Sequence, residues 1–245
     1  MKTIIAALII VLTGSVFSQT LNITSHNLKE NSAEKKYEIT VNYPQIDFGP
    51  EALMGMRGVA EDINVEITKL FNGQVVSFRE LSAEDNYDCP QPLNYMEISY
   101  TTAYKNNGYL SFMFETYSNP RCAAHPMTFQ NSFNYSYVSK GLLTIDSLFT
   151  PGSGWLEYIS DYCIKELNAK AKKDGLENNE NNIKEGAGPK PENFNTFTVN
   201  DHTLEITFNL YKVGPYVWGF QTVSIPWKNL VKMVDPKGPL GFMVK

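Results

Sequence analysis

Hydrophobic residues in the N-terminal half follow first the period of a β-strand and then that of an α-helix. After a polar lead-in over residues 19–36, residues 37–43 are apolar at every second position, which predicts a half-buried strand ending at Pro44. From residue 51 the spacing changes to three and four, which places the apolar side chains on one face of a long helix. That face carries Ala52, Met56, Val59, Ile63, Ile67 and Leu70. We expect it to pack in the core.

Strand patterns dominate the middle of the chain. Residues 95–104 and 109–117 flank the sequence Lys-Asn-Asn-Gly at residues 105–108. Because Asn and Gly accept the positive φ angles of a tight turn, a β-hairpin is predicted. Residues 127–138 and 142–145 continue the strands as a meander.

A second helix is predicted over residues 154–173, followed by a loop. The apolar face of this helix carries Leu156, Ile159, Cys163, Leu167 and Ala171. Residues 175–193 contain five Asn, four Glu and clustered Gly and Pro, with almost nothing to bury. This composition predicts a mobile loop.

The last part of the chain returns to strand patterns. Three strands are expected over residues 194–199, 204–211 and 218–225, and a short helix begins at Pro226. Strands grouped apart from a few helices, without strand–helix alternation, predict an α+β fold. We therefore expect a mainly antiparallel β-sheet with one long N-terminal helix and a second helix packed on it.

The first 18 residues have the pattern of a signal peptide. Lys2 gives a positive start, residues 4–12 form an apolar run, and Val16 and Ser18 occupy the positions that a signal peptidase reads. The run is shorter than the roughly 20 residues that span a bilayer, and no second such stretch follows. We expect an exported protein, periplasmic or secreted in a bacterial envelope, with no membrane span in the mature chain.

Composition narrows the class of protein further. The 245 residues are 42% hydrophobic and 13% aromatic, which is enough apolar surface for a sizeable core. The net charge of −5 argues against nucleic acid as a partner, because a phosphate backbone requires a basic surface.

The three cysteines predict one disulfide and one buried thiol. Cys89 and Cys122 lie just beyond the open end of the predicted hairpin, close to cross-strand register, so we predict a disulfide between them. Cys163 shares the apolar face of the second helix and is expected to be a buried free thiol. Cys122 and His125 have the spacing of half a metal site, but no second pair completes four ligands. Neither a metal nor a cofactor is expected.

Motifs for nucleophilic, phosphate-binding or zinc-peptidase chemistry are absent from the sequence. The remaining catalytic candidate is His125, which lies in a loop between strands beside Pro126. Two interpretations stay open for it, a structural role in the turn and acid–base catalysis with a nearby carboxylate.

Several motifs resemble an extracytoplasmic domain family shared by RsiV-like and PdaC-like proteins. They are Ala-Ala-His-Pro at residues 123–126, Phe-Asn-Tyr at 133–135, the Gly-Leu-Leu-Thr-Ile-Asp-Ser-Leu-Phe run within 140–149, Tyr-Lys-Val-Gly-Pro-Tyr-Val-Trp-Gly at 211–219 and Val-Ser-Ile-Pro at 223–226. The resemblance implies an α+β fold in two parts. Residues 19–121 correspond to an N-terminal PdaC-like module, and residues 122–245 to a C-terminal RsiV-like module with the mobile loop at 175–193.

The resemblance also implies a place in the cell envelope. RsiV-like proteins are membrane-tethered anti-sigma factors whose exported domain binds lysozyme, and PdaC-like proteins join the domain to a separate peptidoglycan deacetylase domain. This sequence lacks the sigma-binding part and the deacetylase metal motif. We therefore expect an exported, non-catalytic binding module that recognises a lysozyme-like protein or peptidoglycan. The alternatives are a cell-wall polymer hydrolase using His125 and a structural envelope protein.

Two loops are the expected binding surface. Pro215, Tyr216 and Trp218 lie in a Gly-Pro-Tyr-Val-Trp-Gly segment, and His125 lies in the other loop. Tyr and Trp offer rigid apolar area with a polar group, which suits both protein interfaces and stacking on sugars. The sequence leaves the oligomeric state open.

Overall fold

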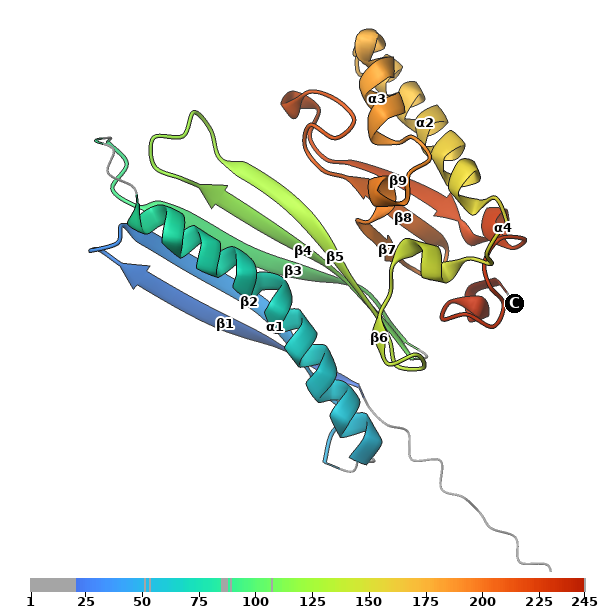
Figure 1. Ribbon diagram of the computed structural model, residues 1–245, viewed down its shortest axis with the longest axis horizontal. Helices are drawn as coiled ribbons and strands as arrows, with labels where there is room; N and C mark the ends of the chain where they lie inside the picture. The colour runs from blue at the N-terminus through green and yellow to red at the C-terminus, as the bar shows by residue number, and fades with distance from the viewer. Residues whose placement is uncertain are drawn as a thin grey trace, which may run out of the picture.

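A computed structural model of the protein describes residues 21–50, 52, 54–84, 88, 90–106 and 108–244. They form two β-sheets with helices on them (Figure 1). The first sheet contains, in spatial order, β1 (Asn22–Ser32), β2 (Tyr37–Asp47), β3 (Asn94–Asn106), β4 (Tyr109–Asn119), β5 (Met127–Ser136) and β6 (Gly141–Leu142). Every neighbouring pair in it is antiparallel except β2 and β3, which are parallel. The predicted signal peptide, residues 1–18, lies outside the described residues.

The parallel pair is connected by the long helix α1 (Met54–Ala83), which lies across one face of the first sheet (Figure 1). Its buried stripe includes the predicted Val59, Ile63 and Ile67. The helix extends beyond Leu70 because Phe71, Val75 and Phe78 continue the stripe at the same spacing. Together with side chains of β2, β3, β4 and β5, this stripe forms the first core. The predicted long amphipathic helix is confirmed.

Strand β1 was not predicted, because residues 19–36 were interpreted as a polar lead-in. β1 pairs along its whole length with β2 and is an edge strand with mostly exposed or half-exposed side chains. It therefore lacks the apolar alternation of a half-buried strand. Its Glu30 accepts hydrogen bonds from Arg79 of α1 and from Tyr37, and the Arg79 guanidinium lowers the pKa of this carboxyl group.

The predicted hairpin is confirmed as β3 and β4. Near the turn the pairs are Tyr104 with Ser111 and Asn106 with Tyr109, and a β-bulge between Thr102 and Tyr104 shifts the register of the rest of the ladder by one residue. Cys89, one half of the predicted disulfide, lies outside the described residues, so the Cys89–Cys122 bridge stays a prediction.

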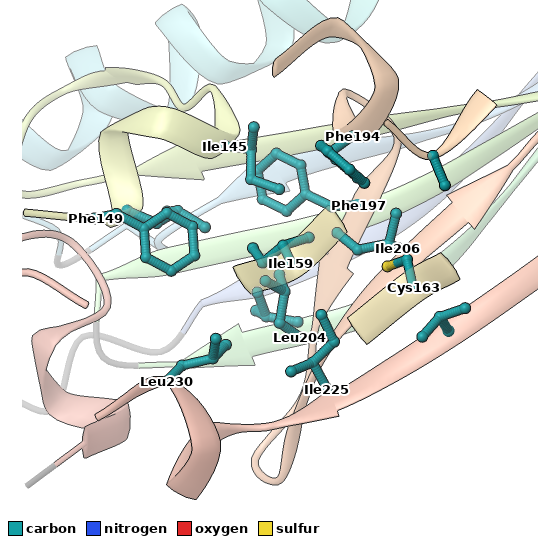
Figure 2. Close-up of a cluster of buried hydrophobic side chains, with 14 of the residues drawn as sticks. Ile145, Phe149, Ile159, Cys163, Phe194, Phe197, Leu204, Ile206, Ile225 and Leu230 are labelled. Carbon is teal, nitrogen blue, oxygen red and sulfur yellow. The ribbon is translucent and has the colours of Figure 1, made fainter. Parts of the chain in front are cut away.

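The second sheet has three antiparallel strands, β7 (Phe197–Val199), β8 (Thr203–Phe208) and β9 (Gln221–Pro226). Helix α2 (Trp155–Lys173) packs on it, and the short α4 (Trp227–Leu230) follows β9. Their apolar side chains make the second core, shown in Figure 2. The expected second helix is thus confirmed, and it covers the second sheet. Cys163 lies inside this core as a fully buried free thiol, as predicted.

The structure differs from the sequence prediction at residues 175–193. Instead of an irregular loop, this segment forms two 3₁₀ turns (Glu177–Asn179 and Pro191–Phe194) around helix α3 (Glu180–Gly186). Ile183, Ala187 and Phe194 are fully buried in the second core. The composition of the segment is polar, but these few apolar residues fall where the short helix can bury them.

The two sheets are joined by hydrogen bonds to the open edge of β7. The main-chain groups of Phe197 and Val199 point away from β8, and none of the described strands pairs with them there. Side chains of the first sheet replace that strand: Asn134 Nδ2 donates to Phe197 O (2.8 Å), and Ser132 Oγ accepts from Phe197 N (3.0 Å). Ser111 Oγ lies 3.4 Å from Val199 N. The buried main-chain groups along this strand edge are thereby satisfied by polar side chains.

The architecture confirms the α+β class with mainly antiparallel sheets. The expected module boundary at residues 121 and 122 falls inside the first sheet, because β5 and β6 both follow it. β5 also supplies Phe133 and Tyr135 to the first core.

Candidate functional site

Two loops from different sheets meet at one end of the molecule. Residues 120–126 connect β4 to β5 and carry His125, and residues 209–220 connect β8 to β9 and carry Pro215, Tyr216 and Trp218. Both loops extend toward the top of Figure 1. The loops that were expected to share a surface are therefore neighbours in space.

Asn209 holds the second loop against the beginning of β5. Its Oδ1 accepts from Gln130 N (2.6 Å) and its Nδ2 donates to Gln130 O (2.9 Å). These two bonds satisfy both main-chain groups of Gln130, as a residue of a neighbouring strand would. The pair joins residues 79 positions apart in the chain and fixes the distance between the two loops.

One main-chain oxygen orients the two central rings. Tyr216 Oη donates to the carbonyl oxygen of Pro126 (3.2 Å), and His125 Nδ1 lies 2.9 Å from the same oxygen. Because a carbonyl oxygen only accepts, Nδ1 of His125 carries the proton and, in the neutral ring, Nε2 is left as an acceptor. The ring centroids of His125 and Tyr216 are 4.6 Å apart.

Tyr211 extends this pair into a row of three rings, with its centroid 5.6 Å from that of Tyr216. Tyr211 is 55% exposed and Val217 is 85% exposed. We call the exposed surface of His125, Tyr211, Tyr216 and Val217 the aromatic patch. Apolar side chains gathered at the surface on loops are typical of contact surfaces.

Tyr211 was missed as a surface residue by the sequence interpretation, which placed it at the end of a strand. Its backbone has a φ angle of 64°, in the left-handed region that bulky residues rarely adopt. Cys122, in the other loop, has a φ angle of 61°. Such conformations cost free energy and cluster at functional sites.

Trp218 supports the loop from beneath. Its indole packs against the second core, and its Nε1 donates to Asp174 Oδ2 (3.0 Å). A Cβ atom on Gly214 would lie 2.5 Å from Cε3 of Trp218, so only glycine leaves room for the indole. Asn179 Nδ2 also donates to Val213 O (2.6 Å). The loop is thus fixed on both sides of its exposed tip.

Among the residues that the structure describes, no Asp or Glu is bonded to His125. The imidazole is exposed, and within the described part of the chain no hydrogen bond joins it to Asp or Glu. The same residues contain no group of three or more His, Cys, Asp and Glu side chains that could hold a metal ion.

Comparisons with known proteins find similarity to the DUF3298 family and to PdaC. Residues 146–228 match the family described as "Protein of unknown function (DUF3298)". The chain is 24% identical over 198 residues to the peptidoglycan-N-acetylmuramic acid deacetylase PdaC of Bacillus subtilis. That match covers 81% of this chain and 39% of PdaC, so the chain spans well under half the length of this relative. The resemblance inferred from the motifs is confirmed at the level of this domain family.

Two crystal structures share the fold. A DUF3298 family protein from Pseudomonas aeruginosa PAO1 superimposes with a TM-score of 0.61 at 12% identity, covering 89% of this chain and 95% of that one. A member of the same family from Bacteroides fragilis gives a TM-score of 0.60 at 13% identity, covering 93% and 98%. Among the residues described here, none of the helices has the length and apolar character needed to cross a bilayer.

Proposed function

We propose that this protein is an exported, non-catalytic binding module of the bacterial cell envelope, and that the aromatic patch is its contact surface for a lysozyme-like protein or a cell-wall glycan. The observation that carries the proposal is the ring pair of His125 and Tyr216, which a shared acceptor holds in place on two cross-linked loops. Surface rings that are already ordered lose little conformational entropy when a ligand binds.

The relatives support the envelope part of the proposal. PdaC is by name an enzyme of peptidoglycan, and the part of it that this chain matches is a minor share of its length. A module that recurs beside a wall-modifying activity is suited to binding the wall or a protein that acts there. The predicted signal peptide would deliver the chain to that compartment.

A binding experiment with two ligands tests this function. The mature protein is assayed against a c-type lysozyme by titration calorimetry and against purified insoluble peptidoglycan by co-sedimentation. We expect at least one to bind, and Tyr216→Ala to weaken binding by about tenfold or more, because buried aromatic contacts dominate such surfaces. Leu81→Ala is the control, since Leu81 is an exposed apolar residue of α1 outside the patch.

A second variant tests the support of the patch. Asn209→Ala changes no residue of the aromatic patch but removes both bonds to Gln130. The separation between the two loops is then no longer fixed. It should weaken the same ligand severalfold while the protein stays folded by circular dichroism. The function is wrong if neither ligand binds, or if Tyr216→Ala binds as tightly as Leu81→Ala.

A further inference from the structure

A polar groove of about 420 Å³ adjoins the aromatic patch at Tyr211. It lies between α3, the 3₁₀ turn Pro191–Phe194 and the β8–β9 loop. The side chains that give it its chemistry are Asn182, Glu185, Lys190, Glu192, Asn193 and Tyr211. The groove is thus lined by hydrogen-bonding groups and one exposed aromatic ring.

The floor of the groove is rigid. A Cβ atom on Gly186 would lie 1.9 Å from the carbonyl oxygen of Lys212, so α3 and the β8–β9 loop touch there without a side chain between them. Asn193 is buried, and its Nδ2 donates to Glu185 O (3.2 Å) and Gly188 O (2.9 Å). None of the described residues donates a hydrogen bond to its Oδ1, which leaves an acceptor in the lining.

The charges around the groove balance. Glu185 and Glu192 contribute two negative charges, and Lys190 and Lys212 two positive ones. All four side chains are exposed, and within the described part of the chain none of them forms an ion pair. A groove with donors and acceptors of both signs and no net charge favours an uncharged, polar ligand over an anion or a basic protein.

We propose that this groove binds an uncharged glycan segment, with one sugar ring stacked on Tyr211. A sugar ring has an apolar C–H face, which fits an aromatic ring, and a rim of hydroxyl or acetamido groups, which fits carboxylates, amides and an ammonium group. The rings of Tyr216 and His125 continue from Tyr211 across the patch, so further sugars of the chain follow the same row. This inference rests on the proposed function and assigns the ligand class of the same surface.

Titration with a soluble glycan tests the groove. Tetra-N-acetylchitotetraose is titrated into the mature protein by calorimetry, and its fully deacetylated counterpart, which carries amino groups, serves as the charged comparison. We expect the neutral oligosaccharide to bind and the charged one to bind at least fivefold more weakly. Tyr211→Ala should weaken binding about tenfold, which corresponds to about 1.4 kcal/mol.

A pair of double variants separates groove chemistry from overall charge. Glu185→Ala with Glu192→Ala removes two groove acceptors and should weaken the neutral oligosaccharide threefold to tenfold. Glu157→Ala with Asp161→Ala removes the same charge from the exposed face of α2 and should leave binding unchanged. All four substituted side chains are exposed, so both proteins should fold.

The outcomes distinguish this inference from the proposed function. If lysozyme or peptidoglycan binds in a Tyr216-dependent manner but the oligosaccharide does not bind, the groove proposal is overturned and the function stands. The same holds if both double variants bind the oligosaccharide equally well, or if it binds without dependence on Tyr211. If none of the three ligands binds, both proposals fail.

Discussion

The first core is built from long, regular elements, whereas the second is built from short pieces. The first packs a 30-residue helix on strands of 10 to 13 residues, with an almost unbroken apolar stripe. The second combines strands of three to six residues with helices, 3₁₀ turns and glycines at close contacts. Trp218 anchors the β8–β9 loop to the second core, and Asn209 ties this loop to β5 of the first sheet. The regular region acts mainly as the scaffold and contributes His125 from its β4–β5 loop, whereas the irregular region contributes Tyr211, Tyr216 and Val217.

The hydrogen bonds between the sheets lead us to expect that the second core depends on the first. A three-stranded sheet leaves the edge of β7 open, and polar side chains of β4 and β5 satisfy it. The family match at residues 146–228 covers most of the second core and leaves out those partner strands. We expect the two cores to unfold as one unit.

The largest effects are expected from truncating a large buried side chain in either core. Phe112 lies in the first core and Phe208 in the second, and both are almost fully buried. Phe112→Ala and Phe208→Ala should each lower the free energy of unfolding by about 3 to 5 kcal/mol.

All three tryptophans, Trp155, Trp218 and Trp227, belong to the second core or pack against it, so their fluorescence reports on it alone. Fluorescence and far-UV circular dichroism should give one denaturation midpoint in each variant. Two midpoints would show that the cores unfold separately.

An intermediate effect is expected at the junction. Asn134→Ala leaves Phe197 O without its donor and the hydroxyl groups of Tyr109 and Ser111 without their acceptor. Buried unpaired groups of this kind should cost about 3 kcal/mol in total. The fluorescence midpoint should fall further than that from circular dichroism, because the edge of the second sheet is released. Asn131→Ala, on the same strand, is the control and should change stability by less than about 1 kcal/mol.

The smallest effect is a pH dependence of the second core. Burial raises the pKa of the Cys163 thiol to about 12, from an ordinary value of about 8.5. Above pH 8.5 the thiol ionises in the unfolded chain and stays protonated in the folded protein, so ionisation favours unfolding and stability falls as pH rises toward 12. Cys163→Ala should show a shallower loss of unfolding free energy between pH 8 and pH 10. Equal slopes would contradict this reasoning.

Much of the scaffold could be predicted from the sequence because periodicity directly records burial. Ile39, Val41 and the α1 stripe fall on a clean period of two or of three and four, and they are buried as expected. Strand β1 has no such period, since as an edge strand it exposes most of its side chains. Helix α3 was not predicted because the residues around Ile183 are mostly polar. Composition is an average over a segment, whereas burial differs from one position to the next.

The candidate site was only partly accessible to sequence reasoning. His125 and Tyr216 could be singled out as residues of loops. Their contact depends on the hydrogen bonds between Asn209 and Gln130, which lie 79 positions apart and therefore cannot be predicted from a local sequence pattern. Trp218 was expected at the surface, yet its indole supports the loop because Gly214 leaves room for it. Tyr211 is exposed through a backbone angle that a strand pattern does not record.

The shared acceptor of the two central rings has an evolutionary consequence. It is the main-chain oxygen of Pro126, so no change of side chain at that position can remove it. The acceptor is therefore independent of side-chain identity at position 126, whereas the two donors, His125 and Tyr216, are themselves patch residues. Descendants of this chain can change the ring at either position and keep it ordered by the same oxygen, provided that the new side chain also donates a hydrogen bond.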